Sequence, residues 1–289
     1  KECMMNSLCI KTNNESILKY LQDEFKTFNM LNVSYSCNEF KNYKNIIIHY
    51  KGIDTELFYA KLSTILSYLV IEFFETDIIK TILFSNYFYF DNLELNKILC
   101  LCEENICDDC EYSFQNRQML LFDAFYEYIS NSKSIILTGF INFRLSSYRI
   151  LLNELVDFSV NEYIIEKEYL EFISLLKLYV NSQPPSNSII HLISSNFGII
   201  LLDDKLETIE LQKNNLKYFS DITFSDNDFI LNTLLNILPQ KIYLHLVSIS
   251  PNNFDFINTI KLVFENKITI CQDCNICNLY KNNITTSNK

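Results

Sequence analysis

The first part of the chain alternates between short apolar runs and helical spacing. Residues 14–28 place apolar side chains three and four positions apart, which predicts an amphipathic helix. Residues 54–90 predict one or two further helices, with Asp54 or Thr55 as the N-cap. Apolar, partly β-branched runs that favour extended backbone lie at residues 5–11, 33–36 and 46–50. Residues 1–90 are therefore expected to form a small α/β unit.

The middle of the chain predicts long helices after an acidic, cysteine-rich segment that starts at residue 91. Residues 114–130 predict one helix, and Gly139 predicts a turn. Residues 143–182 contain neither Gly nor Pro and keep helical spacing over about 38 residues, which predicts a helix about 57 Å long. Pro184 ends it, because the residue before a proline disfavours the α conformation. Residues 91–182 are therefore expected to form a central helical region.

The last third of the chain, residues 183–280, changes to the spacing of a second α/β domain. A strand, a helix and a strand at 241–247, 254–265 and 267–271 predict a right-handed crossover with parallel strands. The polar residues 281–289 predict a frayed tail. Before the crossover, the pattern predicts a three-strand meander at 189–194, 199–202 and 206–211 and a helix at 226–238. The expected fold is thus α/β with a mixed C-terminal sheet.

Charge and composition exclude several classes of protein. The 289 residues carry a net charge of −11, which argues against nucleic-acid binding because that affinity comes from Lys and Arg at phosphates. Only three glycines are present, and no glycine-rich phosphate loop or nucleophile turn occurs. Four charged residues interrupt the apolar stretch 62–90, so we predict no membrane span. Without a secretion signal, ten cysteines indicate reduced thiols or metal ligands and a cytoplasmic location.

The strongest candidate for chemistry is Cys271-x-x-Cys274-x-x-Cys277, directly after the last predicted strand. Three thiolates at this spacing can bind zinc or an iron–sulfur cluster, although a fourth ligand is needed. His245 is the candidate, because residues 241–245 and 267–271 share one pattern and would pair in register. The competing interpretation is that these are reduced cysteines in a flexible tail.

Other candidates are weaker. Cys100, Cys102, Cys107 and Cys110 form a second cluster, for which core and surface thiols are the more frequent explanation. His49 and His191 lie in apolar strands, where histidine is usually structural. Arg144 and Arg149 could clamp an anionic partner, since guanidinium binds carboxylate or phosphate with two bonds. Such arginines pair more often with acids of their own chain.

A set of motifs across residues 55–278 points to a known family. They are Asn86-Tyr87-Phe88-Tyr89-Phe90, Gly139 to Leu145 with Tyr148, Val156-Asp157, Glu162-Tyr163, Glu166 to Tyr169, Glu171-Phe172-Ile173, His191, Pro239, Lys241-Ile242, His245 and the three C-terminal cysteines. In these residues the chain resembles the YtxC-like family of sporulation proteins from endospore-forming bacteria. The resemblance implies a role in spore formation and implies no reaction.

Two main hypotheses follow for function. The first is a cytoplasmic, sporulation-associated protein that binds a protein partner and has no catalytic turnover. The alternative is a metal- or iron–sulfur-binding redox or regulatory protein that uses Cys271, Cys274 and Cys277. A third and weaker hypothesis is an enzyme acting on a small anion held by Arg144 and Arg149.

Overall fold

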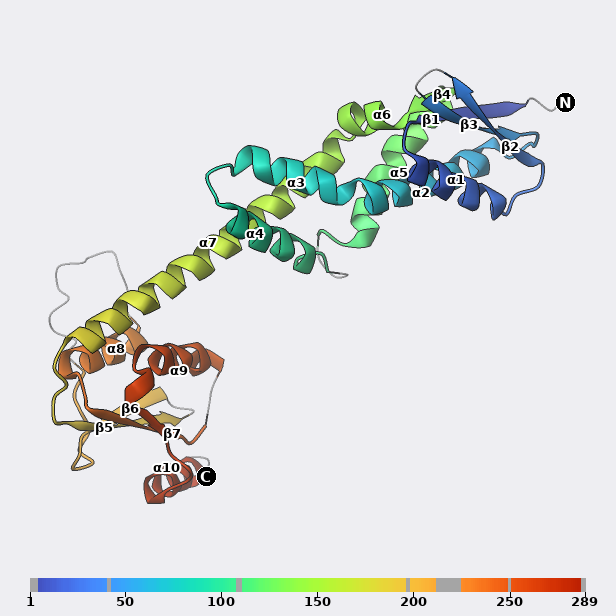
Figure 1. Ribbon diagram of the computed structural model, residues 1–289. Helices are drawn as coiled ribbons and strands as arrows, with labels where there is room; N and C mark the ends of the chain where they lie inside the picture. The colour runs from blue at the N-terminus through green and yellow to red at the C-terminus, as the bar shows by residue number, and fades with distance from the viewer. Residues whose placement is uncertain are drawn as a thin grey trace. The chain divides into compact units, whose positions relative to one another are not determined.

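The computed structural model describes residues 5–40, 43–107, 111–195, 198–211, 225–248 and 251–286 (Figure 1). Within these ranges the chain forms ten α-helices and eight β-strands, and the strands make two mixed sheets. The predicted α/β class is therefore confirmed. Contacts divide the chain into two compact units, Lys1–Ile165 and Glu166–Lys289. The division predicted from the sequence, into residues 1–90, 91–182, 183–280 and 281–289, stays a prediction.

The first unit is built on a four-stranded sheet with the order β2-β3-β1-β4. Strand β1 is antiparallel to β3 and parallel to β4. Its strands are β1 (Asn6–Thr12), β2 (Val33–Phe40), β3 (Tyr43–Tyr50) and β4 (Ser134–Ile136). The three N-terminal strands predicted from the sequence are confirmed, and β4 joins them from a segment that follows four further helices.

Helices complete the first unit and bury one apolar side each. In the first helix the buried residues Ile17, Leu21 and Phe25 are spaced by four, as the sequence predicts. Asp54 accepts a hydrogen bond from the Leu57 N–H and is the predicted N-cap of the second helix. The helices are α1 (Glu15–Lys26), α2 (Thr55–Phe73), α3 (Glu75–Asn86), α4 (Asn92–Glu104), α5 (Phe114–Asn131), α6 (Leu137–Arg144) and the first part of α7 (Ser146–Ser182).

A buried polar cluster ties three of these helices together. Arg117 on α5 donates to one carboxylate oxygen of Glu75 on α3, and the Tyr148 hydroxyl on α7 donates to the other. All three residues are less than a tenth exposed. Burial, and then the Glu75 charge, raise the pKa of Tyr148, so the phenol keeps the proton that it donates. Each buried polar atom of this bridge thus has a partner, which fixes how α7 packs on α3 and α5.

The second unit contains the last part of α7 and a sheet with the order β6-β5-β7-β8. Strands β5 and β6 are antiparallel, whereas β5, β7 and β8 are parallel. The strands are β5 (Ile189–Ser195), β6 (Gly198–Leu202), β7 (Lys241–Leu246) and β8 (Ile268–Ile270), and the helices are α8 (Asp226–Ile237), α9 (Pro251–Val263) and α10 (Asn275–Thr286), with a 3₁₀ turn at Glu265–Lys267. The predicted parallel crossover from β7 through α9 to β8 is confirmed.

The two faces of this sheet have different coverings. Ile190 and Leu192 on β5, with Ile242 and Leu244 on β7, belong to the apolar core of the second unit. Helices α8 and α9 lie on one side of the sheet, and α10 lies on the other (Figure 1). Because side chains alternate along a strand, His245 points away from the core face that Leu244 occupies. The histidine therefore lies on the side that α10 covers.

Two local predictions are wrong. Gly139 lies inside α6 rather than in a turn, because burial of Leu137, Phe140 and Ile141 outweighs the roughly 1 kcal/mol that glycine costs a helix. Residues 206–211 form no third meander strand and contribute only an isolated bridge, from Thr208 to Leu202. Residues 281–286 are the last part of α10, residues 287–289 lie outside the described residues, and the frayed tail stays a prediction. The turn that the predicted meander needs between residues 189–194 and 199–202 includes residues 196 and 197, which lie outside the described residues.

Candidate metal centre

The register of β7 and β8 places His245 beside the cysteine motif. Ile242, Tyr243 and Leu244 pair with Ile268, Thr269 and Ile270, a constant offset of 26 residues that continues to His245 and Cys271. The Cys271 N–H donates to the Leu244 carbonyl over 2.9 Å and extends the pairing past the end of β8. The register predicted from the shared sequence pattern is therefore confirmed.

The chain after β8 turns so that the next two cysteines come back towards the sheet. Asp273 has a φ of 64°, a left-handed conformation that Asp tolerates better than most residues. Helix α10 then begins at Asn275, and the Asn278 N–H donates to the Cys274 carbonyl. Cys274 and Cys277 are three residues apart at this helix start, so both thiols lie on the same side of it.

These elements bring four ligand atoms into one group. The ligand atoms of His245, Cys271, Cys274 and Cys277 all lie within 4.8 Å of one another. The His245 Nδ1 is 3.4 Å from the Cys277 sulfur and 3.5 Å from the Cys274 sulfur. The Cys277 sulfur is 3.8 Å from that of Cys271 and 3.9 Å from that of Cys274. It is the sole such group of His, Cys or acidic residues among the described parts of the chain.

Four of the six separations, those of His245 and Cys271 from Cys277 and those of His245 and Cys277 from Cys274, match the edges of a tetrahedron around one ion. Zinc binds sulfur at about 2.3 Å and imidazole nitrogen at about 2.0–2.1 Å, so tetrahedral ligands stand about 3.8 Å apart for two sulfurs and about 3.5 Å for sulfur and nitrogen. In a [4Fe–4S] cluster each protein ligand binds a different iron, and in a [2Fe–2S] cluster the four ligands are divided between two irons, so four ligand atoms all within 4.8 Å of one another are too close together for either cluster. The donor set therefore fits a single soft ion, and zinc in particular, better than a cluster.

Burial and local hydrogen bonds distinguish the thiols. Desolvation raises the pKa of Cys277 to about 11, and its side chain is only 3% exposed. Desolvation also acts on Cys274, but the N–H groups of Cys277 and Ile276 and the Cys271 thiol outweigh it and lower the pKa of Cys274. A bound cation would hold both sulfurs as thiolates, because coordination deprotonates a thiol outright.

The imidazole of His245 is held from its other side by a second histidine. His245 is 2% exposed, and its Nε2 lies 2.9 Å from the Nδ1 of His191 on β5. Burial lowers the pKa of both histidines, and His191 adds to the effect at His245. Both rings are then neutral near pH 7, as a metal-binding imidazole must be. A cation bound at Nδ1 of His245 would leave the proton on its Nε2, and His245 would then donate to the Nδ1 of His191.

The partner role of His191 is one that sequence analysis did not find. His191 and His245 both stand between apolar residues in strands, and for His191 this pattern gave only the structural interpretation. Their strands are parallel neighbours, with His191 opposite Tyr243, so the two histidines lie two residues apart on one face. Both strands share an apolar–His–apolar pattern, which was the available signal. This pattern does not show which strands are neighbours in the sheet, so it could not predict the contact.

The second cysteine cluster does not assemble in the part of the chain that the structure describes. Cys100 is exposed and Cys102 is fully buried, both on α4. Cys110 lies outside the described residues, so a site that combines it with Cys107 stays a prediction. The eight described cysteines form no disulfide.

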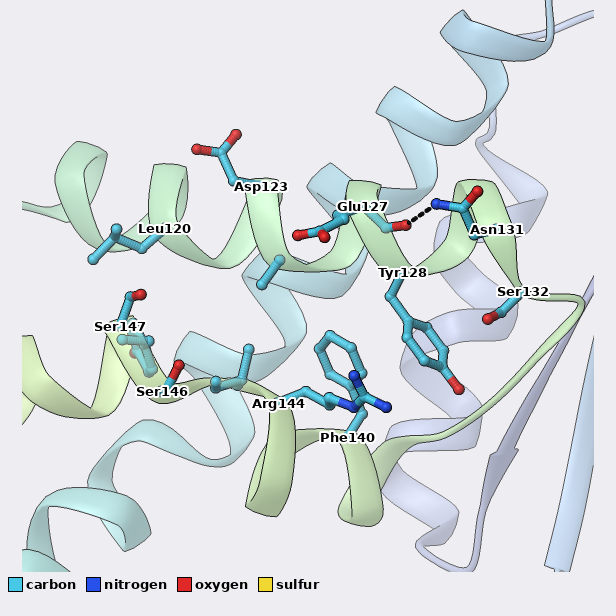
Figure 2. Close-up of a pocket in the computed structure, with 13 residues that line it drawn as sticks. Leu120, Asp123, Glu127, Tyr128, Asn131, Ser132, Phe140, Arg144, Ser146 and Ser147 are labelled. Carbon is cyan, nitrogen blue, oxygen red and sulfur yellow. Dashed lines mark hydrogen bonds between the residues drawn. The ribbon is translucent and has the colours of Figure 1, made fainter.

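The structure separates the two arginines proposed to clamp an anion. Arg144 is exposed and lines a pocket of about 580 Å³ between α5 and the α6–α7 corner, with Asp123 and Glu127 opposite (Figure 2). Its guanidinium lies 5.9 Å from the centre of the Tyr128 ring. Arg149 is not part of this lining and donates to the Ile141 carbonyl and the Asn142 side chain. A joint role of both arginines stays a prediction.

Fold and site together define a two-unit α/β protein with a Cys₃His group on one face of its second sheet. The chain belongs to the YtxC-like family, which matches residues 60–269. This span contains His191 and His245 and ends before Cys271. Neither curated proteins nor solved structures give a match. Among the described helices none alone is long and apolar enough to cross a membrane, and only α2 and α3 together, bent by 51°, meet that criterion.

Proposed function

We propose that the second unit is a zinc-binding module and that zinc has a structural role there. The single observation that supports this most strongly is the set of four ligand atoms at tetrahedral separations. His245, Cys271, Cys274 and Cys277 supply all four positions, whereas catalytic zinc keeps one position open for water or substrate. A closed site favours a structural or regulatory ion over metal-assisted catalysis.

The position of the site explains what the ion would do for the fold. Strand β8 has three residues and α10 has twelve. A helix of this length is only marginally stable by itself, so α10 needs further interactions to stay on the face of the sheet that it covers. An ion bound by His245 of β7, by Cys274 just before α10 and by Cys277 within it would hold this helix against the sheet. Metal binding then supplies folding free energy that the short elements lack.

We further propose that the protein acts in spore formation, in the cytoplasm, by binding a protein partner. Membership of the YtxC-like family supports the sporulation role. The closed ligand set supports docking over turnover, because it offers no reactive position. A metal- or redox-responsive regulator that uses the same cysteines is the second candidate, favoured by the lowered pKa of Cys274.

Elemental analysis of anaerobically purified protein tests the zinc proposal. We expect one zinc per chain, lost on Cys274→Ser and retained on Cys100→Ser, whose thiol is exposed and far from the motif in sequence. A folded protein without metal would overturn the proposal. Iron and inorganic sulfide in the purified protein would show that the site holds an iron–sulfur cluster and not zinc. For the cellular role, the same two variants are compared in the sporulating host. Loss of heat-resistant spores with Cys274→Ser alone is the expected result.

A further inference from the structure

The last part of α7 is apolar on two opposite sides. One side packs into the core of the second unit, where Ile173 is 4% and Val180 is 1% exposed. The other side faces solvent with four large apolar residues in little more than two turns. These are Phe172 (49% exposed), Leu175 (64%), Leu178 (66%) and Tyr179 (44%). Two opposite sides of this helix are therefore apolar, and only one of them is buried.

The exposed residues form one continuous stripe. Their spacings of three and four keep them on one side of the helix. A surface helix normally carries charged and polar residues opposite its buried side, and apolar residues all round indicate burial against a further element. Contiguous exposed apolar surface of this kind marks interaction sites more often than scattered single residues do.

Acidic residues extend the stripe by one turn towards the start of α7. Glu168 and Glu171 are exposed and lie on the same side as Leu175. Neither forms an ion pair within the described residues. The nearest downstream cation, Lys177, instead binds Glu265 at 2.7 Å. We call Glu168, Glu171, Phe172, Leu175, Leu178 and Tyr179 the outer stripe of α7.

We propose that the outer stripe binds an amphipathic helix of another protein, with an apolar face that covers Phe172, Leu175, Leu178 and Tyr179 and with Lys or Arg beside Glu168 and Glu171. Helix-in-groove recognition uses apolar anchors at this spacing. The same stripe of a second copy would add two more carboxylates and no cation, and an anionic membrane would repel the acidic end. The inference rests on the docking part of the proposed function and is independent of the metal.

Fluorescence anisotropy with a labelled synthetic peptide tests the inference on the full-length protein. The probe is an amphipathic helix with Leu on one face and Lys on the other, compared with a counterpart that has Glu in place of Lys. We expect binding of the Leu/Lys peptide only. Leu175→Ser/Leu178→Ser should weaken it by about tenfold, since truncated apolar anchors dominate such losses. Glu168→Lys/Glu171→Lys should weaken it by about fivefold, and less at high salt.

Matched variants control for general effects. Ile53→Ser removes an apolar residue that is 91% exposed in the first unit, and Glu154→Lys reverses an exposed charge earlier on α7. Both should bind the peptide as the wild type does. Failure of the wild type to bind, or equal binding by the outer-stripe variants, would overturn the inference. A dimer in light scattering that Leu175→Ser/Leu178→Ser dissociates would assign the stripe to a second copy instead. The zinc content of the same samples is measured as well. Because peptide binding and zinc content are independent readouts, a sample that holds zinc but does not bind the peptide would overturn this inference and leave the metal proposal intact.

Discussion

The Nδ1 of His191 lies 2.9 Å from the Nε2 of His245, while the Nδ1 of His245 faces the sulfurs of Cys274 and Cys277. One imidazole thus contacts the ligand group with one nitrogen and a neighbouring strand with the other. Metal-binding histidines generally donate their second N–H to such a partner, which fixes the tautomer and the ring orientation. His191 is therefore a positioning residue for the proposed centre.

Replacing His191 should weaken zinc binding without removing a ligand. In His191→Phe the buried Nε2–H of His245 loses its acceptor, and the expected loss of zinc affinity is about 10- to 100-fold. His191→Gln keeps an acceptor and should lose less. Competition with a chromophoric chelator measures both affinities, and the cobalt-substituted spectrum reports whether His245 still binds. Unchanged affinity in His191→Phe, with metal lost in His245→Ala, would reject the positioning role.

Metal removal should loosen the second unit and leave the first intact. Without the ion, α10 loses its attachment to β7, and the buried thiol of Cys277 should become reactive towards a thiol reagent. Cys102, fully buried in the first unit, is the internal control and should stay protected. Zinc at about a thousand times its dissociation constant should stabilise the fold by about 4 kcal/mol. Chelator-independent protection of Cys277 would show that α10 is held by packing alone.

The buried cluster of Glu75, Arg117 and Tyr148 should contribute to the stability of the first unit. Tyr148→Phe leaves one oxygen of Glu75 without its donor and should cost about 1–3 kcal/mol. Arg117→Met leaves a buried carboxylate without its counter-ion and should cost about 3–5 kcal/mol. Urea unfolding measures both, with Tyr179→Phe, on the exposed side of α7, as a control expected to change little. A neutral Arg117→Met would mean that Glu75 is solvated or protonated in the native state.

Much of the fold could be predicted because its elements have strong local patterns. The β-branched run that becomes β3, the four-residue spacing of α1 and the long Gly- and Pro-free stretch that becomes α7 each specify one structure. Strand β4, with three residues, is too short to show any period, and its place beside β1 depends on a long-range contact. Gly139 misled for a related reason, because tertiary burial of its neighbours outweighs its weak helix propensity.

The site was predictable where sequence pattern fixes strand register. Residues 241–245 and 267–271 share an order of side chains, and two parallel strands with that order pair most readily without a shift. This register predicted that His245 and Cys271 lie side by side. The turn at Asp273 and the helix that returns Cys277 did not, because polar residues after a strand resemble a tail. The contact between His191 and His245 depends on β5 being the neighbour of β7, which no local pattern specifies.

X-ray absorption at the zinc edge of the purified, anaerobically handled protein would identify the ligands of the ion. We expect one zinc per chain, with three sulfur ligands at about 2.3 Å and one nitrogen ligand at about 2.0–2.1 Å. Loss of the nitrogen contribution in His245→Ala, and of one sulfur in Cys271→Ser, would assign the shell to these residues. Zinc with an oxygen ligand from water, or a folded protein that holds no metal, would contradict it.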